Sequence, residues 1–143
     1  MPPLRTTGGK GLHLVVPLSP AQGWEAVRAF AHGIARAHAR DDPAHVTALL
    51  SKSKREGRVF IDYLRNRRGA TAIASYSTRA RPGAPVAIPV RWDELGPDLR
   101  GDRFDVESTR QRLASLGSDP WEGFDEARRP LTGAMVRAVG ERR

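Results

Sequence analysis

The sequence predicts an α+β fold in which a mostly antiparallel sheet with a central hairpin is flanked by helices. Several short regions alternate apolar and polar residues with a period of two, which is typical of strands. Other regions repeat apolar residues at helical spacing. A chain of 143 residues can build one modest core, so we expect residues 1–143 to form a single domain or a part of one.

The first strand and the first helix follow from residues 11–40. The alternation in GLHLVVPL, residues 11–18, predicts a strand that leaves a glycine turn. Ser19 and Pro20 then supply an N-cap and a first-turn proline. Apolar residues recur at helical spacing after this signal, so we expect an amphipathic helix that ends near Arg40 and packs on the sheet.

A second helix and the central hairpin are expected next. Asp42 and Pro43 repeat the start signal, which predicts a helix over residues 45–55. Segments 58–65 and 70–75 are rich in strand-forming residues and are joined by a short turn that contains glycine. Together they predict a hairpin.

The rest of the chain combines an extended segment with helices. Residues 79–91 are rich in proline, so they predict an extended segment that wraps the surface. Residues 106–116 and 121–139 predict two helices, although Pro130 and Gly133 oppose a continuous helix in the second segment.

Asp62 is the unusual residue of the predicted hairpin. In an extended strand it would share one face with Phe60 and Leu64, so a carboxylate would lie between two hydrophobic side chains. Removing an ionised carboxylate from water costs roughly several kcal/mol unless a cation or hydrogen-bond donors compensate it. The pattern leaves two interpretations open, a metal-binding carboxylate or a hydrogen-bonded structural aspartate at a sheet end.

A glycine-rich turn precedes the first strand. In TTGGKGLH, residues 6–13, the glycines let backbone N–H groups approach an anion, Lys10 adds a charge, and the threonine hydroxyls can donate to phosphate oxygens. The Walker A spacing is absent, and the turn opens a strand rather than a helix. The turn predicts either a phosphate-binding loop, with His13 reaching the same ligand, or a flexible entry to the strand.

The charge balance favours a polyanionic partner. The chain carries 24 Lys and Arg against 16 Asp and Glu, a net charge of +8, and its pI is about 11.1. Nucleic acid is therefore the first candidate. No stretch approaches the roughly 20 apolar residues of a membrane span, and no secretory signal is present. We expect a cytoplasmic chain that associates with the nucleoid. The sequence has no cysteine, so disulfides, thiolate catalysis and cysteine zinc sites are excluded.

Basic residues concentrate on either side of Asp62. One carboxylate, a glycine turn and many cations form the combination that metal-assisted phosphoryl or nucleotidyl transfer requires. The alternative for the cations is an ordinary solvated surface. The cluster consists of Lys52, Lys54, Arg55, Arg58, Arg65, Arg67, Arg68, Arg79 and Arg81.

Three strings of the sequence resemble a known family in order and spacing. They are TTGGKGLHLVVPL, SKSKREGRVFIDYLRNRRGATAIASYSTRARPGAPVAIPVRWDEL and RFDVESTRQRLASLGSDPWEGF. They resemble the C-terminal half of the polymerase domain of bacterial DNA ligase D, which belongs to the archaeo-eukaryotic primase superfamily. The resemblance covers about residues 5–123, and it implies a partial primase-type domain.

The resemblance also implies residue roles. The glycine turn and its histidine would bind the triphosphate of the incoming nucleotide, Asp62 would be a catalytic carboxylate of the metal site, and basic side chains would contact phosphates. The triphosphate-binding residues would be Thr7, Gly8, Gly9, Lys10, Gly11 and His13, and the phosphate-contacting candidates would be Lys52, Arg55 and Arg79. The cofactor would be Mn2+ or Mg2+, and ribonucleotides would be favoured. The implied partners are DNA ends, nucleoside triphosphates, a ligase domain and Ku.

The chain departs from the family at three points. The family usually has serine in place of Thr7 and proline in place of Ser75. Its Asp-x-Asp pair, which precedes the glycine turn and supplies most of the metal ligation, occurs nowhere in this chain. Two metal ions generally need more than one carboxylate. We therefore expect either one half of an end-filling polymerase or primase, completed in trans by an N-terminal half, or a non-catalytic basic remnant that binds DNA or nucleotides.

Overall fold

The computed structural model describes residues 1–20 and 22–140. They divide into two compact units, which are described separately. The first unit contains Met1–Pro17 and Ile73–Arg128, and the second contains Leu18–Ala72 and Arg129–Arg143. Short strands and three α-helices occur together in the described chain, so the expected α+β class is confirmed. None of the described helices is long and apolar enough to cross a membrane.

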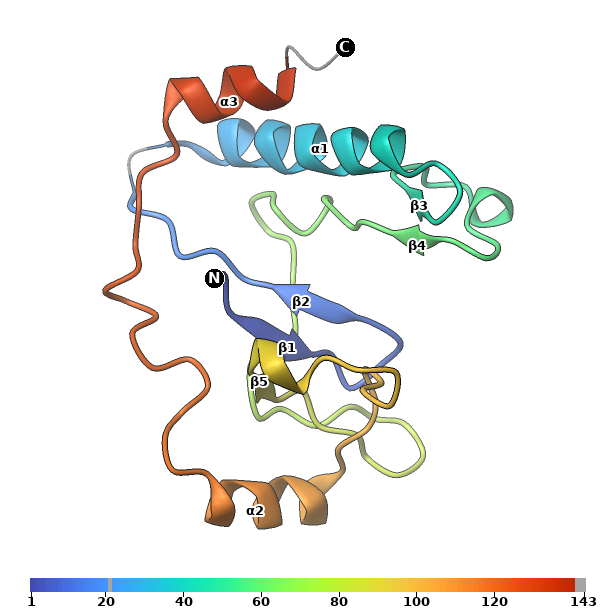
Figure 1. Cartoon of the computed structure of the whole chain (residues 1–143), viewed down its shortest axis with the longest axis vertical. Coiled ribbons are helices and arrows are strands. Elements are labelled where there is room, and N and C mark those ends of the chain that lie inside the picture. Colours follow the sequence, from blue (N-terminus) through green and yellow to red (C-terminus); the bar gives the residue numbers. More distant parts are fainter. Residues whose placement is uncertain (21, 141–143) are drawn as a thin grey trace. The chain divides into compact units, whose positions relative to one another are not determined.

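An antiparallel sheet lies at the centre of the first unit (Figure 1). Its strand order is β2-β1-β5, with β1 at Leu4–Thr6, β2 at Leu12–Leu14 and β5 at Pro89–Val90. Strands β1 and β2 form a hairpin around the glycine turn, and Arg5 lies opposite His13 in their register. Directly opposed residues share one face of a sheet, so these two side chains project from the same face.

The core of the first unit includes a segment that was expected at the surface. Residues 85–90 are all buried, and Val86, Ile88 and Val90 pack with Leu4 in one hydrophobic cluster. The prediction that 79–91 wraps the surface is wrong for residues 85–90. This part of the segment is buried and ends in the edge strand β5, where proline is tolerated.

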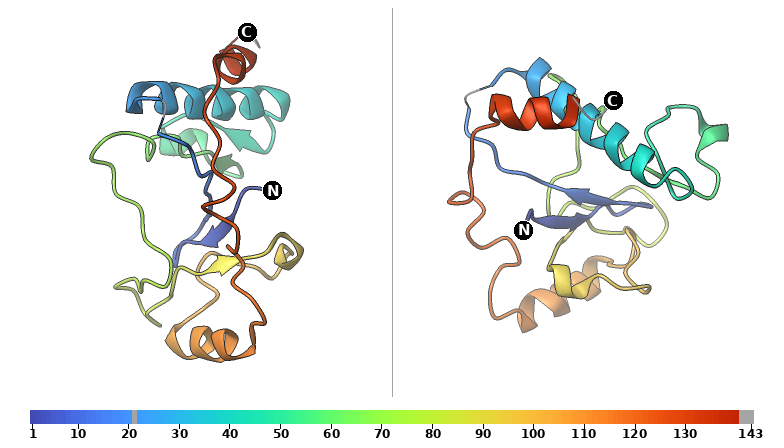
Figure 2. Two further views of the ribbon diagram at one scale, coloured as in Figure 1. Left: turned by 90° about the vertical axis from the view of Figure 1, so that its left-hand side faces the viewer. Right: turned by 45° about the horizontal axis from the view of Figure 1, so that its top comes forward.

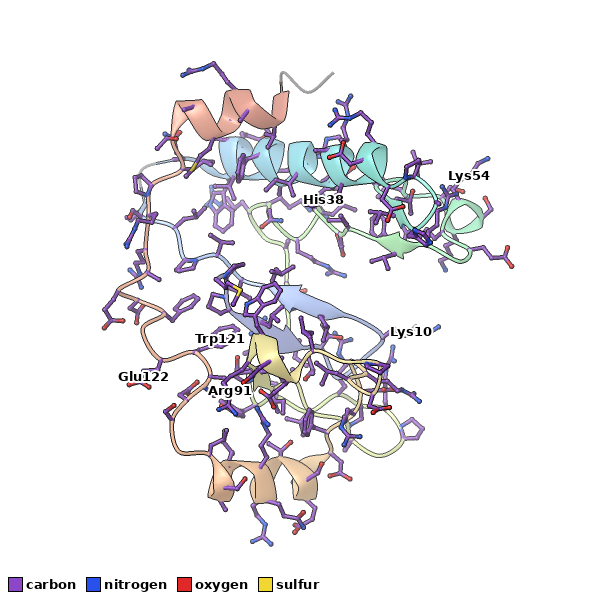
Figure 3. All side chains as sticks on the ribbon, in the orientation of Figure 1. Lys10, His38, Lys54, Arg91, Trp121 and Glu122 are labelled. Carbon is purple, nitrogen blue, oxygen red and sulfur yellow. The ribbon has the colours of Figure 1, made fainter. Side chains whose placement is uncertain are left out.

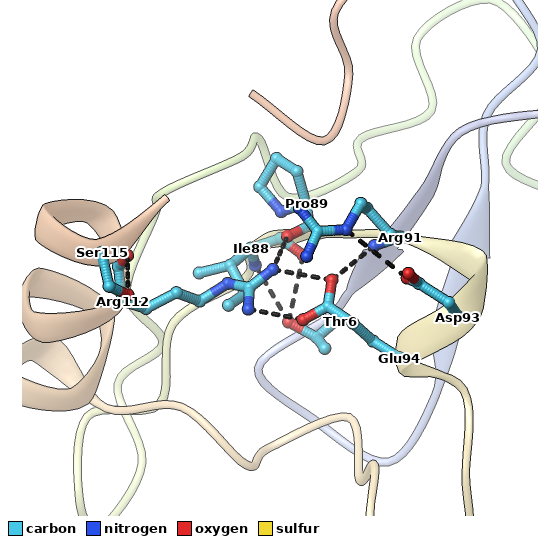
Figure 4. Close-up of polar contacts among 8 residues, drawn as sticks. All are labelled: Thr6, Ile88, Pro89, Arg91, Asp93, Glu94, Arg112 and Ser115. Carbon is cyan, nitrogen blue, oxygen red and sulfur yellow. Dashed lines mark hydrogen bonds and ion pairs between the residues drawn. The ribbon is translucent and has the colours of Figure 1, made fainter. Parts of the chain in front are cut away.

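The predicted helix after this strand is confirmed as α2, Val106–Ser115. Asp105 caps its first turn by accepting a hydrogen bond from the Ser108 N–H across 2.8 Å. A short 3₁₀ turn at Trp92–Glu94 precedes it, and Glu94 forms an ion pair with Arg112 of α2, as Figure 4 shows. Burial alone would raise the pKa of Glu94, but hydrogen bonds from Arg112 and from the Arg91 N–H, together with both positive charges, lower it.

The second unit is built around α1, Trp24–Asp41, and α3, Gly133–Gly140. The two helices lie side by side in both views of Figure 2. A Cβ placed on Gly33 of α1 would lie 2.6 Å from Cγ2 of Val139 in α3, so the helices approach closely where α1 lacks a side chain. Helix α1 begins at Trp24 with Gly23 as its N-cap, later than the Ser19-Pro20 signal predicts.

Three further local predictions are wrong. Residues 45–55 are not helical: β3, Val46–Thr47, pairs in parallel with β4, Val59–Phe60, and a 3₁₀ turn occupies Lys52–Lys54. Asp42 does accept a hydrogen bond from the His45 N–H, but β-branched Val46 and Thr47 then join a strand. Within the described residues β4 has only β3 as a strand partner, so the hairpin of 58–65 with 70–75 does not form. The helix expected over 121–139 is limited to α3.

Candidate functional site

The glycine turn between β1 and β2 is closed by Thr7. Its hydroxyl donates to the Gly11 carbonyl across 2.8 Å and accepts from the Gly9 N–H across 3.2 Å. Thr7 is only 7% exposed, so its hydroxyl holds the loop together from inside. Thr6 is fully buried, and its Oγ1 accepts a hydrogen bond from the Ile88 N–H, which excludes the suggested contact with a phosphate.

Arg79 holds the same turn from a distant part of the sequence. Its Nε donates to the carbonyl oxygen of Thr7 across 2.7 Å, and its side chain lies against Gly8. Gly8 has a φ of 63°, a conformation that favours glycine. Tyr76, at the start of the motif that leads to Arg79, also has a positive φ of 63°, and its N–H donates to the Ala87 carbonyl. A strained non-glycine residue thus turns the chain toward the loop.

Gly101 packs against the other side of the turn. A Cβ at this position would lie 2.7 Å from the Gly9 carbonyl oxygen and would also overlap Gly11. Real Cβ atoms do not approach backbone oxygens so closely, so only glycine fits here without displacing the turn. The sequence gives no signal for this contact, because it joins residues about 90 positions apart that share no motif.

Lys10 lies at the tip of the turn and is exposed. In Figure 3 its side chain points away from the ribbon. His13 follows on β2 and is half-buried. The predicted residues Thr7 to His13 and Arg79 therefore come together in the first unit, with a cationic side chain at the open end of the loop. This arrangement can receive an anion such as a phosphate group.

Sequence reasoning missed Arg5, which lies beside His13. Its Nη2 is 3.0 Å from His13 Nδ1 and its Nη1 donates to the Ser75 hydroxyl across 3.3 Å. Its guanidinium carbon is 5.4 Å from the centre of the Trp121 ring, a cation–π distance. Burial lowers the pKa of Arg5. A basic residue on the strand before the glycine turn, opposite a histidine, was the available signal.

Asp62 belongs to the second unit and does not lie within a strand. It follows β4 and its side chain is 38% exposed. Oδ1 accepts from the Leu64 N–H across 3.0 Å, and Oδ2 accepts from Arg65 Nε across 3.2 Å. The expectation of a buried carboxylate between two hydrophobes is wrong, because the strand ends before Asp62 and a turn begins there. Desolvation therefore gives no reason for a metal at this residue.

Arg55 and Lys52 also lie in the second unit. The Arg55 guanidinium donates to the Leu49 and Leu50 carbonyl oxygens and lies 3.6 Å from the centre of the Phe60 ring. These contacts brace the loop after β3. Lys52 is exposed in the 3₁₀ turn. Their contact with phosphates stays a prediction.

A metal centre requires more ligands than this part of the chain supplies. Across residues 1–20 and 22–140, no group of three or more His, Asp or Glu side chains is arranged to hold a metal ion. Asp62 offers a single carboxylate as a metal ligand, and Arg65 balances its charge. The described residues therefore do not fit a two-metal site on their own.

Comparison with known proteins places these features in a family. Residues 2–121 match the family of the LigD primase-polymerase domain. The chain is 43% identical over 138 residues to a multifunctional non-homologous end joining protein LigD from Pseudomonas aeruginosa. The matched region covers 96% of this chain. A protein of the same name from Mycolicibacterium smegmatis is 43% identical over 120 residues and covers 80% of this chain. Such matches define a polymerase domain of primase type.

A solved structure shows the same relationship. The polymerase domain of Mycobacterium tuberculosis ligase D, in complex with DNA, is similar with a TM-score of 0.80 and 35% identity over 88% of this chain. The chain therefore belongs to the LigD primase-polymerase domain family. It spans 43% of that solved chain, and 16% of the length of each of the two curated relatives.

Proposed function

We propose that this chain contributes the nucleotide-phosphate-binding part of a LigD-type polymerase that extends or fills DNA ends in non-homologous end joining. The observation that carries the proposal is the bond from Arg79 to the Thr7 carbonyl, which fixes the glycine turn with Lys10 at its tip. Family membership supports the assignment, since the matched solved domain was determined in complex with DNA.

The chain's own residues bind and orient the triphosphate. Lys10 supplies an exposed positive charge, and Arg79 supplies one whose Nε is already bound to the loop. His13 adds a ring nitrogen from the adjacent strand. Preorganised donors of this kind stabilise charge that develops during phosphoryl transfer without reorganising at the moment of reaction. Nucleoside triphosphates, with ribonucleotides favoured, are the proposed substrates.

Divalent metal, Mn2+ or Mg2+, is the proposed cofactor of the complete enzyme. Asp62 is the ligand that this chain would contribute, and the other carboxylates would come from the remainder of a polymerase domain. When bound, the metal would offset the negative charge of the reacting phosphates. The ligase domain and Ku stay proposed partners of the whole protein.

Primer extension tests the proposal. The chain is mixed with a polypeptide that supplies the N-terminal part of a LigD-type polymerase domain, a primed DNA end, ribonucleoside triphosphates and Mn2+. We expect extension only when both polypeptides are present, and its loss in Lys10→Ala and in Asp62→Ala. Arg110→Ala, which removes an exposed charge from α2 in the same unit as the glycine turn, is the control. Extension that survives both Lys10→Ala and Asp62→Ala would refute the assignment.

A second candidate is binding without catalysis. The lack of a three-ligand metal group in the described chain and the net charge of +8 favour it. It predicts DNA binding whose affinity falls steeply with salt and is the same with and without Mn2+. Binding titrations at two salt concentrations, each with and without Mn2+, separate this candidate from the polymerase.

A further inference from the structure

Arg5 is a buried cation that has no carboxylate partner among residues 1–20 and 22–140. It is 9% exposed, and its Nε has no hydrogen-bond partner. Among the residues that the structure describes, none of the ion pairs involves it; its contacts are Ser75, His13 and the Trp121 ring. A buried charge normally has a compensating partner, because its desolvation is costly. The burial of this charge therefore indicates that Arg5 has a role in addition to packing.

The contact with His13 determines which ring nitrogen carries a proton. A guanidinium has only donors, so the bond between Arg5 Nη2 and His13 Nδ1 requires a lone pair on Nδ1. In the neutral imidazole, the single proton must then be on Nε2. The pairing is built into the sheet, since Arg5 and His13 are directly opposed in the register of β1 and β2.

We propose that Arg5 is a positioning residue for His13, which it holds as the Nε2–H tautomer so that Nε2 donates a hydrogen bond to a phosphate oxygen of the nucleotide. The inference rests on the proposed function because the ligand is a nucleotide phosphate. The tautomer of His13 is a property of the protein alone. His13 then acts as an oriented donor, and the positive charge beside it is that of Arg5.

Two neighbours hold Arg5 in the required place. The Trp121 ring faces the guanidinium, and Trp121 Nε1 donates to the Leu4 carbonyl across 2.7 Å, which ties the ring to β1. Ser75 supplies an acceptor for Nη1. The Ser75 hydroxyl is thus a second polar contact, besides His13, that holds the Arg5 guanidinium.

The tautomer of His13 is measured first, without nucleotide. Long-range proton–nitrogen NMR spectra of the full chain, labelled at histidine nitrogens, are recorded at a pH where imidazole is neutral, and His13→Gln identifies the His13 signals. We expect protonated Nε2 and unprotonated Nδ1. In Arg5→Met we expect both tautomers, whereas Arg110→Met, which removes an exposed arginine from the same unit, leaves the His13 signals unchanged. An Nδ1–H tautomer, or an unchanged one in a folded Arg5→Met chain, overturns the proposal.

A second variant and an ATP titration complete the test. If Arg5→Met does not fold, Arg5→Lys retains the buried charge but not the planar donor fork, and the same change of tautomer is expected. ATP titration then measures the consequence. We expect Arg5→Met and His13→Gln each to weaken ATP binding about tenfold, with the double variant little weaker than either. Effects that multiply to about a hundredfold would show that Arg5 acts independently of His13. If the unaltered chain binds no ATP, the proposed function fails, while the tautomer still decides the link between Arg5 and His13.

Discussion

The Nε of Arg79 donates to the backbone carbonyl of Thr7 across 2.7 Å, joining residues 72 positions apart in the sequence. This bond connects the segment after Tyr76 to the glycine turn, and Gly8 leaves room for the Arg79 side chain. Replacement of Gly8 would be doubly unfavourable, because its φ is positive and a Cβ would lie 3.0 Å from the Pro85 carbonyl oxygen.

Arg79→Ala is expected to weaken ATP binding by about tenfold or more, since it removes both a positive charge and the hold on Thr7. Arg79→Lys is expected to restore little, because an ammonium cannot reproduce the planar guanidinium geometry. Calorimetric titration of the full chain measures both. Arg110→Ala, an exposed arginine of α2, should bind ATP like the unaltered chain. Equal losses in Arg79→Ala and Arg110→Ala would mean that only total charge matters.

Gly101→Ala is expected to destabilise the chain by about 1–3 kcal/mol and to weaken ATP binding, because its Cβ would overlap the glycine turn at Gly9 and Gly11. Thermal unfolding and ATP titration measure the two effects. Gly96→Ala is the matched control from the preceding turn, since a Cβ there meets nothing within 4 Å. If Gly101→Ala has the stability and affinity of Gly96→Ala, the packing of Gly101 against the loop is disproved.

The glycine turn was predictable from sequence because it consists of contiguous residues. Arg79 came from the family resemblance, and the structure brings it to the turn. Arg5 and Gly101 were not predictable, because their roles depend on long-range register and close approach. Asp62 was misplaced because strand propensity extended β4 past its actual end, and residues 45–55 were misread because tertiary pairing overrode a local helix signal.

Buried proline-rich sequence shows the same limitation. Residues 85–90 looked like a surface segment, yet they form the core because Thr6 and Ile88 exchange hydrogen bonds across the sheet. Local composition describes the extended conformation correctly but not the side to which it packs. The helix expected at 106–116 agrees with α2 to within about one residue, because helical apolar spacing is a local signal.

Gly33→Ala tests the contact between α1 and α3. Alanine favours an isolated helix by about 1 kcal/mol over glycine, but its Cβ would overlap Val139, so we expect a net loss of roughly 1–2 kcal/mol. The double variant Gly33→Ala with Val139→Ala should recover stability relative to Gly33→Ala alone. Chemical denaturation measures all three chains. A stabilised Gly33→Ala chain would contradict the close packing.

The ion pair of Glu94 with Arg112 predicts a pH dependence. Because the folded-state pKa of Glu94 is below its ordinary value of 4.5, the carboxylate stabilises the fold above that pH, and the contribution is lost as pH falls through the lower folded-state pKa. Glu94→Gln should cost about 1–2 kcal/mol at neutral pH and little under acid conditions. Glu107→Gln, in an exposed pair with Arg110, is the control. Equal losses for Glu94→Gln at both pH values would rule out the ion pair as their source.

An NMR titration of the full chain with ATP shows whether the turn between β1 and β2 receives nucleotide phosphates. We expect backbone amide shifts concentrated at residues 7–13, together with Arg79 and Gly101. Lys10→Ala should reduce these shifts. If saturating ATP leaves residues 7–13 unshifted, or shifts the exposed basic residues of the second unit instead, the turn does not receive nucleotide phosphates.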